Sequence, residues 1–88
     1  MKVVVLKVGN SKSSSHGGVY KRCIFKDISI DSVGKEYIFD CYSEHSNSKR
    51  FWPYLKEQAL FDGVDVIEYN GKKVINGNND FHYCGQRH

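Results

Sequence analysis

The 88-residue sequence contains one proline, one methionine, one tryptophan and only three cysteines. With so little proline, its turns must rely on Gly, Asn, Asp and Ser. The odd number of cysteines disfavours the disulfide framework of a small secreted domain, so we expect reduced thiols and a cytoplasmic protein. No apolar run approaches the roughly 20 residues of a membrane span, so the sequence predicts no association with a membrane.

The sequence also lacks the common signatures of catalysis. It contains no G-x-S-x-G turn, no P-loop and no G-x-G-x-x-G motif. The serines between positions 11 and 15 lie in a glycine-flanked segment that would hold a nucleophile poorly. We therefore predict that the protein is not an enzyme and needs no cofactor.

Metal-ligand spacing is absent as well. Structural zinc sites usually pair cysteines or histidines a few residues apart, whereas only Tyr83 separates His82 from Cys84. Cys23 and Cys41 fall inside predicted strands, where a free cysteine behaves as a small buried hydrophobe. We predict no metal site, and we expect both of these thiols to be buried and unpaired.

The residues that are present suit one small domain spanning positions 1–88. Hydrophobic residues make up 40% of the chain and aromatic residues 14%, which is enough for a folded core. The formal charge of +3 is too small to identify a polyanion binder by itself. Any such function must depend on where the charges cluster.

Alternating apolar residues predict the first three strands. These strands cover residues 2–8, 19–30 and 35–42, with a flexible loop at 9–18 and a turn at 31–34. In the second strand, Cys23 and Phe25 share one face, but the apolar positions then switch to Ile28 and Ile30. Such a switch predicts a bulge near Lys26-Asp27.

The second half of the chain begins with helical spacing. Trp52, Leu55 and Ala59 recur at that spacing, and Pro53 suits a first turn, so we expect a helix near residues 52–60 with Trp52 and Leu55 in the core. Asn70-Gly71 is a strong hairpin signal. The remaining predicted segments are strands at 64–69 and 72–76, a turn at 77–80, a short strand at 81–84 and a loose tail at 85–88.

This order of elements is the layout of the OB fold, a Greek-key barrel. We predict a mainly β, five-stranded OB-like barrel with one short helix between strands three and four. Residues 55–69 resemble the helix-to-fourth-strand passage of OB-fold single-stranded-DNA-binding proteins, which carries a Gly-Asp pair before a V-x-V strand; here Val64 separates Gly63 from Asp65. The size and layout are similar to those of the small single-stranded-DNA-binding proteins of phages and plasmids.

Basic and aromatic residues on one face define the candidate site, because single strands are bound by a positive groove with aromatic rings on which bases stack. If Cys23 and Phe25 fill the core, the opposite face of the second and third strands points outward. The loops that frame an OB cleft would contribute lysines, with His16 beside the first. The alternative is a set of ordinary cross-strand pairs and solvated lysines. The candidate residues are Tyr20, Arg22, Lys26, Tyr42, Lys12, Lys72 and Lys73.

The function that this pattern favours is non-enzymatic binding of single-stranded nucleic acid, with DNA as the expected form and little sequence preference. We expect a homodimer, because one small barrel offers a short contact track and linked sites gain avidity. Two alternatives remain open: a small protein-interaction module, such as a phage-encoded inhibitor of a host protein, and a structural assembly component.

Overall fold

A computed structural model describes residues 1–15, 17–29, 34–45, 48–77 and 80–87. His16 and parts of the predicted segments at 19–30, 31–34, 77–80 and 85–88 lie outside these residues. The described chain is mainly β, as the sequence predicted. Its elements are β1 (Val3–Val8), β2 (Lys12–Ser13), β3 (Val19–Asp27), β4 (Glu36–Tyr42), the 3-10 helix η1 (Lys49–Tyr54), β5 (Ala59–Asp62), β6 (Val66–Tyr69), β7 (Lys72–Ile75) and β8 (His82–Gln86).

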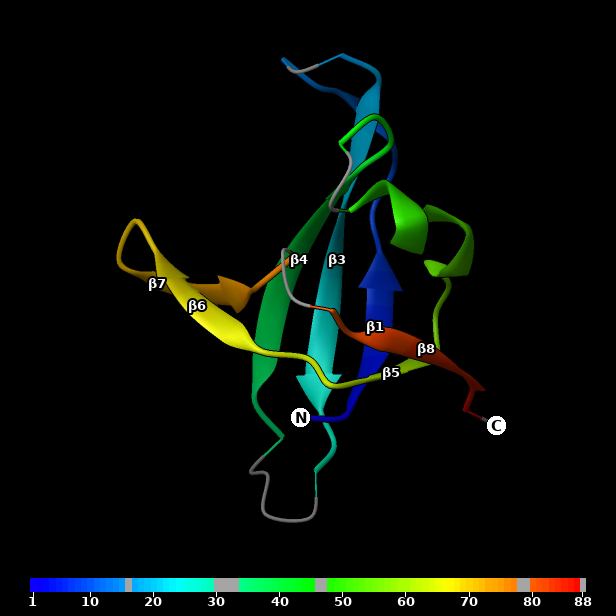
Figure 1. Ribbon diagram of the computed structural model, residues 1–88, viewed down its shortest axis with the longest axis vertical. Helices are drawn as coiled ribbons and strands as arrows, with labels where there is room; N and C mark the ends of the chain where they lie inside the picture. The colour runs from blue at the N-terminus through cyan, green and yellow to red at the C-terminus, as the bar shows by residue number, and fades with distance from the viewer. Residues whose placement is uncertain (16, 30–33, 46–47, 78–79, 88) are drawn as a thin grey trace.

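The strands form one curled sheet in the order β6-β7-β4-β3-β1-β5-β8, with β2 paired to β3 (Figure 1). Strands β1, β3 and β4 form an antiparallel meander, and β5 returns to lie beside β1, which is a Greek-key arrangement. Strand β7 runs parallel to β4. The predicted five strands were too few, and the strand order of the described residues is an open path rather than a closed barrel.

The core lies inside the curl of the sheet and is built around all five phenylalanines of the chain. Each of them is at most 4% exposed, and their rings contact one another; those of Phe51 and Phe81, for example, stack with centroids 3.9 Å apart. Cys23 and Cys41 are buried among them as free thiols, so their prediction as buried, unpaired cysteines is confirmed.

The predicted helix at 52–60 is wrong. The helical turn is a 3-10 helix that ends at Tyr54, and Ala59–Asp62 forms β5 instead. Pro53 lies inside the short turn and not at the start of a longer helix, and Gln58 has a positive φ of 70°, which a continuing helix does not allow. The side chains of β5 alternate between buried and partly buried. The strand lies between β1 and β8 and pairs with both.

Three further expectations need correction. The register irregularity lies in β1, between Val5 and Lys7, and not near Lys26-Asp27, because β3 simply ends at Asp27. Residues 12–13 of the predicted flexible loop form β2, and Gly85 and Gln86 of the predicted loose tail belong to β8.

The expected core contribution of the helical segment is half right. Leu55 is buried at 6% exposure, as predicted, but Trp52 is only partly buried, and Phe51 occupies the core beside it. The ring of Trp52 is covered by the Nζ of Lys21, which lies 4.5 Å from its centroid. Trp52 therefore caps one end of the core.

Candidate nucleic-acid interface

The centre of the candidate site is a row of three residues on three neighbouring strands. Tyr20 on β3 is paired with Tyr42 on β4 on one side and with Lys12 on β2 on the other. Directly paired residues project to the same face of a sheet. The rings of Tyr20 and Tyr42 accordingly lie side by side, with centroids 5.4 Å apart and planes tilted by 30°. The row therefore presents two aromatic rings and one lysine to the outside.

Arg22 and Asp40 form the next cross-strand pair on this face. The Arg22 Nε donates to Asp40 Oδ1 at 2.9 Å, and Nη2 donates to Oδ2 at 3.1 Å. This bond raises the pKa of the Arg22 guanidinium above its ordinary value, with the charge of Asp40 adding to the effect. Arg22 is thus present where the sequence predicted it, but as one half of a fork-shaped ion pair.

Lys26 does not join the other candidates. It is paired with Glu36, and the Ile24–Ile38 pair lies between it and Arg22. Its position is six residues from Tyr20, or about 20 Å along a strand at ~3.3 Å per residue. Its aliphatic chain lies against Gly34. The strand alternation was correct, but the long strand spreads its cations too widely for one site.

The β6–β7 hairpin separates the second group of lysines: Lys73 lines a different hollow, with Tyr37 and Glu68, and projects to the opposite side of the hairpin from Lys72. Lys72 is paired with Tyr69 and Lys73 with Glu68, across the Asn70-Gly71 turn that the sequence predicted. The two turn residues have φ values of 51° and 76°, as a type I′ turn requires. In Figure 1 this hairpin and the β2–β3 hairpin project from the sheet in different directions.

Two hollows connect these elements. One, of about 370 Å³, is lined by Ser13, Ser14, Ser15, Tyr20, Arg22, Asp40 and Tyr42. The other, of about 250 Å³, lies between β4 and the β6–β7 hairpin, and its lining includes Tyr69 and Ile67. Asp40 and Tyr42 line both. The two hollows therefore share a wall formed by these two side chains of β4.

Tyr42 lies at the meeting point of the two hollows. Burial raises the pKa of its phenol, and the charges of Asp40, Tyr20 and Tyr69 act in the same direction, whereas Arg22 opposes them. The phenol therefore stays protonated and can donate a hydrogen bond at neutral pH.

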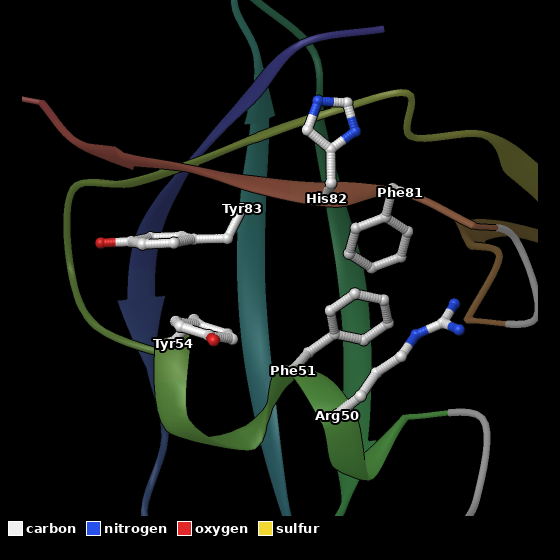
Figure 2. A pocket seen from close by; sticks show the side chains of 6 residues that line it. All are labelled: Arg50, Phe51, Tyr54, Phe81, His82 and Tyr83. Carbon is white, nitrogen blue, oxygen red and sulfur yellow. The ribbon is translucent and has the colours of Figure 1, made fainter.

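A third hollow, of about 400 Å³, lies on another part of the molecule, between η1 and the start of β8 (Figure 2). Its aromatic residues are already paired: Phe51 stacks on Phe81, and Tyr54 stacks on Tyr83 with centroids 4.6 Å apart. Arg50 lies over Phe51 and contacts Asp80 at 3.5 Å. The rings and the arginine that line this hollow contact one another. We therefore interpret the hollow as the contact region between η1 and β8 at the edge of the core, and not as a binding site.

Sequence reasoning missed Asp40 and Tyr69 as site residues. Strand alternation puts Asp40 on the same face as Tyr42, but its pairing with Arg22 depends on the register between β3 and β4. Tyr69 is 64% exposed, among the most exposed of the large hydrophobic side chains. Its position directly before Asn70-Gly71 was the available signal, because a residue beside a tight turn lies near the tip of a hairpin.

Within the described residues, no group of three or more His, Cys, Asp or Glu side chains could hold a metal ion. No helix in that part of the chain is long and apolar enough to cross a membrane. Comparison of the sequence and structure with known protein families, curated proteins and solved structures finds no match.

Proposed function

We propose that this protein binds single-stranded nucleic acid, with DNA as the expected form, without catalysis and with little sequence preference. The observation that carries the proposal is the row formed by Lys12, Tyr20 and Tyr42, which combines adjacent aromatic rings with a cation on one open face. Every base has an aromatic face, so stacking on tyrosine tolerates any sequence. A lysine beside the rings can meet the phosphate that follows each base.

The hairpin at β6–β7 supports a longer contact track. Tyr69 adds a third aromatic ring, in the lining of the second hollow, and Lys72, which is paired with Tyr69, adds charge at the hairpin. A strand that occupied both hollows would pass from the β2–β3 hairpin across Tyr42 to Tyr69. Site sizes of roughly 4–16 nucleotides per OB fold are compatible with such a track.

The arrangement also supports a relation to the OB class. In this proposal β1, β3, β4, β6 and β7 correspond to the five OB strands, and β2, β5 and β8 are additions. OB folds bind their ligands on the face of strands two and three, between the first and last interstrand loops. That face is β3–β4 here, and those loops are residues 9–18 and the Asn70-Gly71 turn. As part of this proposal, we expect the protein to be cytoplasmic. We also expect it to form a homodimer, which would double the short contact track.

Fluorescence anisotropy of a labelled oligo-dT at two salt concentrations tests the proposal. We expect binding at low salt that weakens steeply as salt rises, because each neutralised phosphate releases counterions. Tyr54→Ala is the control variant, and we expect it to bind like the wild-type protein. This tyrosine is also exposed, but it lies on η1, away from the two hollows of the candidate face. The absence of binding to both oligo-dT and oligo-dC at low salt would overturn the proposal.

A second candidate function is a protein-interaction module. The exposed apolar residues Ile67 and Tyr69 on β6 favour it, because aromatic and aliphatic side chains anchor protein interfaces. Binding of a protein through this patch would change little with salt, in contrast to nucleic-acid binding. The dependence of affinity on salt, measured with the ligand that binds, therefore distinguishes the two functions.

A further inference from the structure

Asp40 is a carboxylate at the centre of a face that we propose binds a polyanion. Its side chain is 26% exposed and lines both hollows, so a bound strand must pass over it. The Arg22 guanidinium offsets the charge of Asp40, but the carboxylate oxygens only accept hydrogen bonds, so a phosphate oxygen, itself an acceptor, cannot bond to them. The part of a strand that bonds to Asp40 is therefore a hydrogen-bond donor, and along a DNA strand those donors lie on the base edges.

The ion pair with Arg22 leaves this carboxylate able to accept further bonds. Arg22 donates one N–H to each oxygen. An ionised carboxylate has about four lone-pair sites on its two oxygens, so each oxygen retains one. The two parallel bonds also fix the plane of the carboxylate. A donor that reaches the hollow thus finds an acceptor already oriented.

The neighbouring tyrosines bring a base edge to this acceptor. Asp40 and Tyr42 are two residues apart on β4 and project to the same face, as the pairing of both with β3 requires. Two residues of a strand span about 6.6 Å, which is comparable to the width of a pyrimidine with its exocyclic groups. A base stacked on Tyr42 therefore presents its polar edge within reach of Asp40.

We propose that Asp40 reads the base, accepting a hydrogen bond from an exocyclic amino group, so that the groove prefers cytosine and other amino-bearing bases over thymine and uracil. Cytosine carries the N4 amino donor, which Asp and Glu accept in protein–DNA complexes. Thymine and uracil carry the O4 carbonyl in its place, and two acceptors cannot bond to each other. This inference rests on the proposed function and adds a base preference to it.

The test compares oligo-dC and oligo-dT of equal length at slightly alkaline pH, with affinity measured by anisotropy. We expect oligo-dC to bind wild-type protein roughly three- to ten-fold more tightly, the discrimination of one good polar base contact. In the Asp40→Asn variant, the amide NH₂ can donate to thymine O4. The affinity for oligo-dC divided by that for oligo-dT should therefore fall to one or below. Glu36→Gln is the matched control, because Glu36 lies on the same face of the same strand but outside both hollows.

A ligand change gives the same test without altering the protein. Oligomers that contain N4,N4-dimethylcytosine lack the amino donors, and we expect wild-type protein to bind them no better than oligo-dT. If no oligomer binds at all, the proposed function itself fails. If oligomers bind but wild-type protein does not favour oligo-dC, or if Asp40→Asn keeps the wild-type ratio, Asp40 does not read the base while the proposed function stands.

Discussion

The inner and outer faces of the β3–β4 ribbon differ completely although they share one backbone. On the inner face, Cys23, Phe25 and Phe39 are at most 2% exposed and contact other core residues. On the outer face, the cross-strand pairs are Tyr–Tyr, Arg–Asp, Ile–Ile and Lys–Glu. Neighbouring residues on a strand project to opposite faces, so Arg22, Asp40 and Tyr42 each sit one position from a core residue. Stability and ligand binding should therefore respond to different substitutions in the same strands.

The inner face should show the largest effect. Phe25→Ala removes a ring that stacks on Phe61 at 5.7 Å and contacts Phe39 and Phe81. We expect a loss of about 3–5 kcal/mol in the free energy of unfolding, from lost burial and the cavity left behind. Urea unfolding monitored by circular dichroism measures it. A loss below about 1 kcal/mol would mean that the core does not depend on this ring.

The outer face should show the opposite pattern. Tyr42→Ala removes half of the aromatic pair with Tyr20, and we expect a loss of about 1–3 kcal/mol in single-strand affinity. Its effect on unfolding should be much smaller than that of Phe25→Ala, because Tyr42 is only partly buried. Anisotropy and urea unfolding on the same sample separate the two effects. Unfolding of the variant would contradict the assignment of Tyr42 to the binding face.

The division into faces was predictable from the sequence, because the side-chain period of a strand is two. Alternation placed Cys23 and Phe25 inward and Tyr20 and Arg22 outward, and the burial of these residues agrees. The hairpin at Asn70-Gly71 was predictable for a similar reason, since only a few residues tolerate positive φ at both turn positions. Both signals are local, and nothing distant in the fold opposes them.

The rest depends on interactions between distant segments. Residues 55–60 carry a helical spacing, yet β1 needs a partner, and Gln58 N–H donates to the Val5 carbonyl oxygen at 2.7 Å. Tertiary pairing thus overrides local propensity. The ion pair of Arg22 with Asp40 depends on register, which alternation alone leaves open. The candidate site was therefore predictable as a face, but neither its acidic residue nor the separation of Lys26 was.

Alkaline pH offers a probe of the inner face. Burial raises the pKa of Cys23 to about 11 and that of Cys41 to about 12, from an ordinary value of 9.0. Between these values the unfolded chain loses thiol protons that the folded chain keeps, so stability is present below about pH 9 and falls as pH rises above it.

We expect a loss on the order of 2 kcal/mol for both thiols together between about pH 9 and pH 10. Urea unfolding at the two pH values measures it, with a Cys23→Ala/Cys41→Ala double variant as the reference whose profile should be flatter. Cys84→Ser should keep the wild-type slope, since Cys84 is exposed. Equal slopes in wild-type and double-variant protein would show that the buried thiols ionise as readily as exposed ones.

The smallest effect divides the outer face itself into a binding end and a structural end. Lys12 is paired with Tyr20 beside the tyrosine pair, whereas Lys26 is paired with Glu36 at the far end of β3. Loss of one phosphate contact to a single strand should reduce the slope of log affinity against log salt by about 0.7. We expect that change for Lys12→Ala and no change for Lys26→Ala, with both slopes measured on the same oligo-dT. An equal reduction in both variants would mean that the bound strand follows β3 along its whole length, rather than crossing from the β2–β3 hairpin over Tyr42 to Tyr69.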